Sequence, residues 1–483
     1  MLKEINPLNK DLLSVQDARE LVAKAYEAQK ILAEVDHTKI DRIILAMYKA
    51  GYENAQQLAR MAVDETGFGV LEDKVVKNQF ATKNIYEHIK DMRTTGIIRK
   101  EQKNKIVEIA EPMGVVLGII PSTNPTSTLM YKALIALKAR NAIVFSPHPR
   151  AVKCSGEAAR IMEEAAVLAG APQGSINCLS VCTKEGTEEL MRHPQVAVIL
   201  ATGGLGMVKA AYSAGKPAYG VGPGNVPAFI ERSADIPQAV TDIIAGKTFD
   251  NGTICASEQA IITEEIIAGE VISELKRQGG YFLSPDELGA VEKTVMLPAG
   301  GVNPDVVGKS PQVITGLAGI KIPEQVKVLV AELNEVGKKA PLSAEKLSPV
   351  IAFYIEKDWQ KACERCYELL EFGGMGHTLA IHSRNDEVIK EFAMKKPVFR
   401  ILVNTPSSQG AIGLTTGLEP ALTLGCGTWG GNITADNVGP LHLINRKRLA
   451  YSLRSEAERK TQAFSTVHFT REEVVRAVEE LLN

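Results

Sequence analysis

A cysteine that follows a glycine-containing turn is the first residue that could do chemistry. In the segment 249–259, FDNGTICASEQ, Cys255 stands shortly before an apolar run that we expect to form a strand, which would place its thiol at a strand edge facing a cleft. A thiolate attacks carbonyl carbon well, and backbone N–H groups can lower the pKa of a thiol. Taken alone, Cys255 is also open to the ordinary interpretation, a small buried packing residue.

An asparagine lies just after the first strand that we expect in the sheet. Asn124 belongs to the segment 121–125, PSTNP, and open α/β sheets bind ligands at the carboxyl ends of their strands. Its side-chain N–H could stabilise an oxyanion in a transition state. The alternative is an asparagine that only shapes the turn before Pro125.

Two glycine-rich turns could hold an anion. The segment 201–207, ATGGLGM, lies between an expected strand at 196–200 and an expected helix at 205–214. Glycine lets backbone amides approach a phosphate there, and the N-terminus of a helix favours negative charge. The segment does not match the dinucleotide signature G-x-G-x-x-G. A second turn, GVGPGN, follows at 220–225, and either turn could be structural.

The remaining cysteines show no framework. Seven cysteines, an odd number, are scattered through the chain, which favours reduced thiols over a set of disulfides. Cys363 and Cys366 form a C-x-x-C inside a helical pattern at 359–370, and no second pair follows at the spacing of a zinc site. We expect two packed helix residues there, with redox or metal chemistry as the alternative, and no metal site.

Composition excludes several classes of function. Among 483 residues, 55 Lys and Arg stand against 57 Asp and Glu, a net charge of -2, which gives no field to gather nucleic acid or an anionic membrane. Residues 1–13 lack the continuous apolar core of a secretory signal. The longest apolar runs, of about eight residues, are far short of the ~20 that cross a bilayer. We expect a cytoplasmic protein with a small-molecule partner.

Alternating strands and helices must position these residues. Amphipathic helices are expected at 14–32 and 40–61. The expected strands of a first unit are 113–120, 142–145, 176–180 and 196–200, with helices between them at 128–138, 151–168 and 185–192. A second unit begins near Ala228, with strands at 228–230 and 259–262 and a helix at 237–248. Repeated βαβ units predict an α/β protein with doubly wound parallel sheets.

Two segments stand outside this alternation. The charged, alternating segment 97–109 could form an exposed hairpin that pairs with another subunit, and 442–450 has the pattern of a strand. Thr470 and Glu473 form a capping box before apolar residues at helical spacing, after a polar linker at 456–465. This pattern predicts a short C-terminal amphipathic helix.

Taken together and in order, these segments resemble the aldehyde dehydrogenase superfamily. The similarity runs from about 14 to 448 and is closest to the CoA-acylating branch, such as the aldehyde dehydrogenase half of bifunctional aldehyde-alcohol dehydrogenases. It is carried by the segments 121–125, 145–151, 202–227, 249–259, 345–349, 373–378 and 424–432. The resemblance implies two doubly wound parallel-sheet domains, one for cofactor and one for catalysis, plus a small oligomerisation hairpin and tail.

The resemblance also implies how the chain is divided. Residues 1–229 would form the cofactor-binding domain, with the oligomerisation hairpin at about 93–112. Residues 230–430 would form the catalytic domain and 431–455 an oligomerisation strand, followed by a linker and the amphipathic helix at 456–483.

By position, the resemblance implies a role for each site residue. Cys255 would be the catalytic nucleophile, and Asn124 would hold the oxyanion together with the Cys255 backbone N–H. His377 would help to position cofactor or CoA or assist proton transfer, unless it is a packed histidine. Glu345 would contact the nicotinamide ribose. The full set of implied cofactor-binding residues is Ser122, Thr123, Ser146, His148, Arg150, Thr202, Gly203, Gly204, Leu205, Gly220, Gly222, Glu345 and Gly376.

One departure from the wider family selects the acyl acceptor. Hydrolytic relatives carry a glutamate that activates water where this chain has Gly220. Without that base, water should attack an acyl-enzyme slowly, whereas the thiol of coenzyme A brings its own nucleophilicity. The resemblance therefore implies reversible oxidation of a short-chain aldehyde with NAD or NADP and CoA to acyl-CoA, through a thiohemiacetal and a thioester on Cys255.

Several alternatives stay open at this point. A hydrolytic aldehyde dehydrogenase, a reductase of the glutamate-semialdehyde type and a non-catalytic assembly protein are the rival functions. The aldehyde could be acetaldehyde, propionaldehyde, succinate semialdehyde or sulfoacetaldehyde, since the pocket walls would come from segments such as 405–419. Arg150 is compatible with NAD and with NADP.

The resemblance further implies partners. It predicts a homodimer or a dimer of dimers, and a single activity, because no iron-dependent alcohol dehydrogenase half follows in the sequence given. The C-terminal helix could dock on the shell protein of a bacterial microcompartment or fold back on its own domain.

Overall fold

A computed structural model describes residues 7–298, 300–454 and 469–482. The polar linker expected at 456–465 lies outside these residues. Contacts within the chain define two compact units. One contains residues 1–94 and 112–444, and the other contains 95–111 and 445–483.

The first sheet of the larger unit has five parallel strands in the order β5-β4-β3-β6-β7. Its strands are β3 (Val115–Ile119), β4 (Ile143–Ser146), β5 (Ile176–Cys178), β6 (Val196–Thr202) and β7 (Ala218–Val221). The four strands predicted from the apolar runs are confirmed. The edge strand β7 was not predicted, because its short, glycine-containing sequence has no strand pattern of its own.

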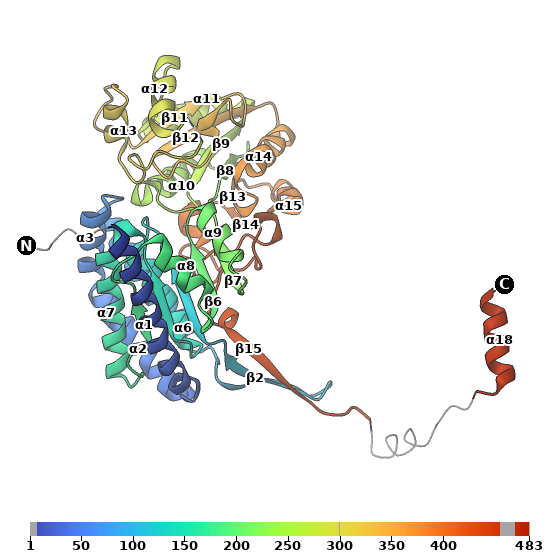
Figure 1. Ribbon diagram of the computed structural model, residues 1–483. Helices are drawn as coiled ribbons and strands as arrows, with labels where there is room; N and C mark the ends of the chain where they lie inside the picture. Colours follow the sequence, from blue (N-terminus) through green and yellow to red (C-terminus); the bar gives the residue numbers. More distant parts are fainter. Residues whose placement is uncertain (1–6, 299, 455–468, 483) are drawn as a thin grey trace, which may run out of the picture. The chain divides into compact units, whose positions relative to one another are not determined.

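Helices cover both faces of this sheet (Figure 1). They are α1 (Pro7–Ala33), α2 (His37–Glu53), α6 (Pro125–Lys138), α7 (Val152–Leu168), α8 (Lys184–Arg192) and α9 (Leu205–Tyr212). Apolar side chains of α1, α8 and α9 pack on the face that carries Val115, Leu117 and Ile119. Because side chains alternate along a strand, α6 and α7 cover the opposite face. The doubly wound arrangement is confirmed.

The single helix expected at 40–61 is wrong. The chain forms α2 and then α3 (Ala55–Thr66), separated at Asn54, whose backbone is not helical. The Asn54 side chain donates to the Ala50 carbonyl, so it competes with the regular helix ladder at this point. Three further helical segments follow, namely α4 (Leu71–Gln79), η1 (Phe80–Asn84) and α5 (Ile85–Ile89).

The second sheet has seven parallel strands in the order β10-β11-β12-β9-β8-β13-β14. They are β8 (Val226–Ile230), β9 (Glu258–Glu264), β10 (Gly280–Phe282), β11 (Val328–Glu332), β12 (Val350–Glu356), β13 (Gly376–His382) and β14 (Val398–Val403). The chain leaves the first sheet at Val221 and enters the second at Val226. The domain boundary at 229/230 stays a prediction.

Helices also cover both faces of the second sheet. One face packs against α10 (Ile236–Thr248) and α11 (Glu265–Arg277). The other packs against α12 (Pro285–Val295), α13 (Pro311–Leu317), α14 (Trp359–Gly373) and α15 (Asp386–Lys395). Cys363 and Cys366 are buried on α14, which confirms them as packed helix residues. The remaining short helices are η2 (Pro149–Ala151), η3 (Phe249–Gly252), η4 (Pro341–Ser343), α16 (Ser407–Ala411), η5 (Thr428–Gly430) and η6 (Pro440–Leu443).

The smaller unit contains a three-stranded sheet and a C-terminal helix. β1 (Gly96–Glu101) and β2 (Ile106–Pro112) form an antiparallel hairpin, as predicted, and β15 (Ile444–Ala450) completes the order β1-β2-β15. α18 (Arg471–Leu482) begins with the predicted capping box, in which Glu473 accepts from the Thr470 N–H at 2.9 Å and Thr470 Oγ1 accepts from the Glu473 N–H at 3.4 Å. Among the described helices, none is long and apolar enough to cross a membrane.

Candidate active site

A cleft of about 550 Å³ lies in the larger unit, where the carboxyl ends of β3, β6 and β7 meet the loop before β9. Parallel strands place their carboxyl ends at one edge of a sheet, which is where ligands bind in this class of fold. Eleven of the residues implied by the resemblance line the cleft, namely Ser122, Thr123, Asn124, His148, Arg150, Thr202, Gly203, Gly204, Gly222, Cys255 and Glu345.

Five of the implied residues do not line this cleft, namely Ser146, Leu205, Gly220, Gly376 and His377. Ser146 is buried, and its hydroxyl lies 2.8 Å from Thr187 Oγ1. Gly376 has a φ of +77°, and a Cβ there would lie 1.8 Å from the Cys426 carbonyl oxygen. Ser146 therefore links β4 to α8, and Gly376 allows a close approach of two backbone segments. The roles of both as ligand contacts stay predictions.

A tight turn delivers Cys255 to the cleft. Asp250, Asn251 and Gly252 have φ angles of 52°, 52° and 75°, three consecutive residues in the left-handed region. This conformation costs on the order of 1 kcal/mol or more at each residue other than glycine. It persists because buried groups hold the turn, which ends three residues before Cys255.

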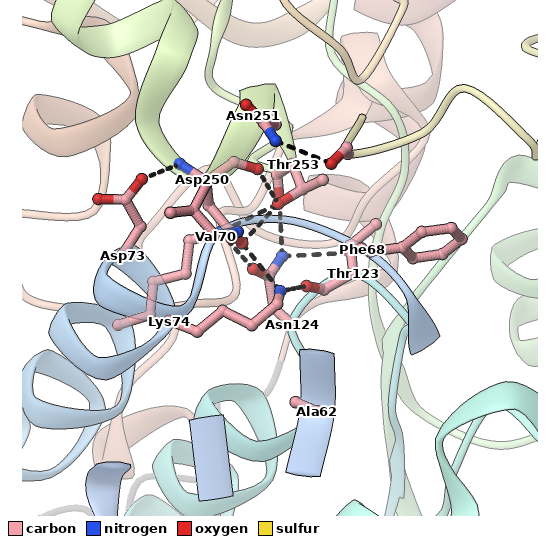
Figure 2. A network of polar contacts seen from close by, with 12 residues as sticks. Ala62, Phe68, Val70, Asp73, Lys74, Thr123, Asn124, Asp250, Asn251 and Thr253 are labelled. Carbon is pink, nitrogen blue, oxygen red and sulfur yellow. Dashed lines mark hydrogen bonds and ion pairs between the residues drawn. The ribbon is translucent and has the colours of Figure 1, made fainter. Parts of the chain in front are cut away.

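The carboxylate of Asp250 is the centre of that support (Figure 2). Oδ1 accepts from the Val70 N–H at 2.7 Å. Oδ2 accepts from Lys74 Nζ at 2.9 Å and Lys77 Nζ at 2.5 Å. Oδ2 also accepts from Thr253 Oγ1, at 2.6 Å. Burial alone would raise the pKa of Asp250, but the two lysines outweigh it and the pKa is lowered. The turn is therefore tied to α4 by a buried, charged network.

Asn124, in the loop between β3 and α6, joins the same network. Its Oδ1 accepts from Lys77 Nζ at 2.7 Å. Its amide nitrogen donates to the Thr253 carbonyl at 2.9 Å and to Thr123 Oγ1 at 3.2 Å. The amide that could serve an oxyanion thus lies beside the turn that carries the cysteine (Figure 2).

The electrostatics of the cleft keep the Cys255 thiol protonated in this state. Burial and, secondly, Glu345 raise the pKa of Cys255 to about 12, while Arg400 acts in the opposite direction. Burial also raises the pKa of Glu345 to about 7, although Glu345 accepts from the Gly224 N–H at 3.3 Å. Among the residues lining the described cleft, Glu345 is the only carboxylic acid.

The model of the aldehyde dehydrogenase family matches residues 9–279, more than half of the chain. The chain belongs to this family. It is 45% identical over 442 residues to the bifunctional aldehyde-alcohol dehydrogenase AdhE of Escherichia coli, covering 90% of this chain and 50% of that protein. The chain thus spans about half the length of the first curated relatives that it matches.

Two solved structures of the aldehyde dehydrogenase family match over nearly their full length. An acetylating aldehyde dehydrogenase from Geobacillus thermoglucosidasius is 55% identical, with a TM-score of 0.91, over 92% of this chain and 98% of that one. A propionaldehyde dehydrogenase from Rhodopseudomonas palustris, with bound CoA and an acylated cysteine, is 28% identical. Its TM-score is 0.82, over 90% of this chain and 97% of that one.

Gly220 offers no space for a side chain. A Cβ there would lie 2.7 Å from Val208 Cγ1 and 2.9 Å from Tyr212 Cε2. The position faces α9 and is not part of the cleft wall. The place where hydrolytic relatives carry the water-activating glutamate therefore supplies neither a carboxylate nor room for one.

His377 lies behind the cysteine and does not reach the cleft. The ring is fully buried, and a Cβ on Gly224 would lie 2.3 Å from the Cys255 carbonyl oxygen and 3.1 Å from His377 Cγ. Nδ1 is 2.9 Å from Thr378 Oγ1. Burial and, secondly, Arg400 lower the pKa of His377 to about 3, so the imidazole is neutral. Its catalytic role stays a prediction.

Sequence reasoning missed two sets of residues around the cleft. The first is the apolar wall, which consists of Phe68, Val302, Pro304, Val307, Leu347, Leu422 and Leu424. These residues come from loops and carry no pattern. Of the segment 405–419, expected to form walls, Ile412 lines the cleft. The second set is the network of Lys74, Lys77 and Asp250, for which the only signal was a turn-forming DNG triplet at 250–252.

Proposed function

We propose that this protein is a CoA-acylating aldehyde dehydrogenase, which oxidises a short-chain aldehyde with NAD or NADP and transfers the acyl group to coenzyme A. The observation that carries the proposal is that Cys255 and Asn124 line the same cleft, while position 220 is a glycine and has no carboxylate. The acetylating relative and the acylated cysteine in a CoA-bound relative support the same chemistry.

The residues at one end of the cleft fit a dinucleotide. α9 begins at Leu205, and the preceding Gly204 has no side chain to cap the first N–H groups of the helix, which suits a pyrophosphate. The Thr202 hydroxyl is buried and has no hydrogen-bond partner among the described residues, and it lines the cleft. His148, Arg150 and Glu345 would hold the two riboses and the adenine end. When bound, the nicotinamide supplies a hydride acceptor for the aldehyde carbon.

The chain's own groups carry the covalent steps. The Cys255 thiol must release its proton to solvent as substrate binds, and its sulfur then bonds to the aldehyde carbon. The oxygen becomes an oxyanion, and Asn124 exchanges one of its present hydrogen bonds for a bond to that oxygen. Loss of hydride from the carbon leaves a thioester on Cys255. The thiolate of CoA attacks this carbonyl, acyl-CoA leaves and the Cys255 thiolate is restored.

Water is a poor second substrate in this arrangement. Activation of water needs a general base close to the acyl carbon. Gly220 provides none, and Glu345, the only acid lining the described cleft, would be held by the ribose of the bound cofactor. The thioester should therefore persist until CoA binds.

The proposal is tested by following reduced nicotinamide with an aldehyde panel, with and without CoA, together with mass spectrometry of the protein and products. Without CoA, we expect a burst of about one equivalent of reduced nicotinamide per site and an acyl adduct on Cys255. When CoA is added, we expect sustained formation of acyl-CoA. Steady carboxylate release without CoA, at the same rate as turnover with CoA, would identify a hydrolytic enzyme. The panel, run with NAD and with NADP, also identifies the aldehyde and the preferred cofactor.

We also propose the partners of the smaller unit. β1 and β15 are the edge strands of the three-stranded sheet, and a second copy of the chain could cover these edges in a homodimer or dimer of dimers. α18 exposes Val474, Val475, Val478 and Leu481, a surface that would suit the shell of a bacterial microcompartment. Deleting 456–483 should preserve activity and abolish co-localisation with shell protein, and unchanged co-localisation would exclude packaging through this helix.

A further inference from the structure

We propose that Lys77 is a positioning residue for Asn124. The ammonium group of Lys77, anchored on Asp250, fixes the direction of the Asn124 amide beside the Cys255 turn. The inference rests on the proposed function, in which Asn124 stabilises the oxyanion. It adds a group that touches no substrate and acts through its neighbour.

The hydrogen bonds of Lys77 allow only one orientation of this amide. Lys77 Nζ contacts Asn124 Oδ1 at 2.7 Å, Asp250 Oδ2 at 2.5 Å and Thr253 Oγ1 at 3.2 Å. An ammonium group has three N–H donors and no acceptor, so these three partners use its whole capacity. A flipped amide would point its NH2 at the ammonium and its oxygen at the Thr253 carbonyl, and both hydrogen bonds would be lost.

The same contact strengthens Asn124 as a donor. A cation that donates to an amide oxygen draws electron density toward that oxygen and makes the N–H groups better donors. Lys77 is 2% exposed and Asp250 is 0% exposed at the side chain, so solvent screens this effect little. Catalysis by an oxyanion donor depends on such fixed, water-free dipoles.

Asp250 holds the ammonium in place and keeps it charged. Burial lowers the pKa of Lys77 to about 8, against the raising effect of Asp250. The other charged groups that face Lys77 are Lys74, which lowers its pKa, and Asp73, which raises it. Lys77 therefore remains largely protonated at neutral pH, as the hydrogen bond to Asn124 requires.

A purely structural role is the rival explanation, since the network also ties α4 to the turn before Cys255. The two roles differ in whether the effect of Lys77 depends on Asn124. If Lys77 acts through Asn124, its removal should matter little once Asn124 is gone. If it only holds the fold, its removal should cost the same in both backgrounds.

A double-mutant cycle on the full-length protein separates these roles. Lys77→Met, Asn124→Ala and the double variant are compared by the single-turnover rate of nicotinamide reduction at saturating aldehyde, before CoA is added. In the wild-type background, we expect Lys77→Met to lower this rate about 10- to 100-fold with little change in the KM for aldehyde. In the Asn124→Ala background, we expect the same substitution to lower the rate by less than about threefold.

Lys138→Met is the matched control, because Lys138 is also a fully buried lysine paired with an aspartate, Asp41, at 2.6 Å. Lys138→Met should leave the single-turnover rate nearly unchanged in the wild-type background and in the Asn124→Ala background.

The effect of Lys77→Met in the two backgrounds decides between the two roles. Equal factors for Lys77→Met in the two backgrounds would overturn the inference while leaving the proposed function intact. Absence of any aldehyde-dependent reduction by the wild type would instead overturn the proposed function. If Lys77→Met does not fold, Lys77→Gln is placed in the same cycle with the same criterion, because its amide keeps a neutral donor at this position.

Discussion

The side-chain amide of Asn124 donates to the main-chain oxygen of Thr253 at 2.9 Å, across 129 residues of sequence. Asn124 follows β3 in the first sheet, and Thr253 precedes β9 in the second. This hydrogen bond therefore joins the ends of two sheets at the point where Cys255 enters the cleft. It explains how an amide and a thiol so distant in sequence come to line one cleft.

Replacing the nucleophile should abolish acyl transfer. Cys255→Ser removes the only thiol lining the described cleft, and we expect the rate of acyl-CoA formation to fall about 10⁴-fold or more. The matched control is Cys178→Ser, since Cys178 is also half-buried but lies on β5, outside this cleft. It should retain the rate within about twofold. Acyl-CoA formation at the wild-type rate by Cys255→Ser would contradict the mechanism.

The reactivity of Cys255 should rise steadily with pH. Because burial and Glu345 raise its pKa to about 12, the thiolate fraction in the absence of substrate should increase about tenfold for each pH unit across the range from about 7 to 10. The rate of iodoacetamide labelling at Cys255, followed by mass spectrometry with Cys255→Ala as a blank, measures this. A plateau reached below pH 8 would show that the resting thiol is already ionised.

A methyl group at position 220 should destabilise the fold without creating hydrolysis. In Gly220→Ala, the new Cβ meets Val208 and Tyr212, and overpacking of this kind lowers the free energy of unfolding by about 1–3 kcal/mol. Gly222→Ala is the control, because a Cβ at Gly222 has no atom within 4 Å. Denaturant unfolding measures both variants. An equal loss of stability in the two would show that Gly220 is not tightly packed.

Removing the carboxylate of Asp250 should unfold the nucleophile turn. Asp250→Asn removes the carboxylate that pairs with the buried Lys74 and Lys77, which should lower the free energy of unfolding by about 3–5 kcal/mol. Glu364→Gln, in an exposed ion pair with Lys361, should change it by less than about 1 kcal/mol. A loss for Asp250→Asn as small as that for Glu364→Gln would contradict the network.

The Asp250 contribution should also depend on pH with a defined sign. The pKa of Asp250 is lowered in the folded protein from its ordinary value of 3.8. Its stabilisation is therefore complete above pH 3.8 and is lost as pH falls through the lower folded pKa. The difference in unfolding free energy between wild type and Asp250→Asn should shrink on acidification in this range, and a difference that grew would contradict the assignment.

The sequence determined the alternation of elements and the reactive residue types. Apolar runs and amphipathic stretches have local periodicities, so the βαβ order, the hairpin at 97–109 and the capped C-terminal helix could all be predicted. Cys255 and Asn124 could be named because motifs are local in sequence. The break at Asn54 was missed because it depends on one side chain competing with the helix ladder.

Only the tertiary structure decided how those residues are held. On α4, Lys74 and Lys77 are three residues apart, and both are buried against Asp250, which their spacing alone does not indicate. The direction of the Asn124 amide follows from contacts with Lys77 and Thr253, which are 47 and 129 residues away in the sequence. The left-handed turn at Asp250 is held by Lys77, which is 173 residues away. Such contacts leave no local pattern, because a hydrogen bond between distant segments depends on where the fold places both partners and not on the spacing of either one.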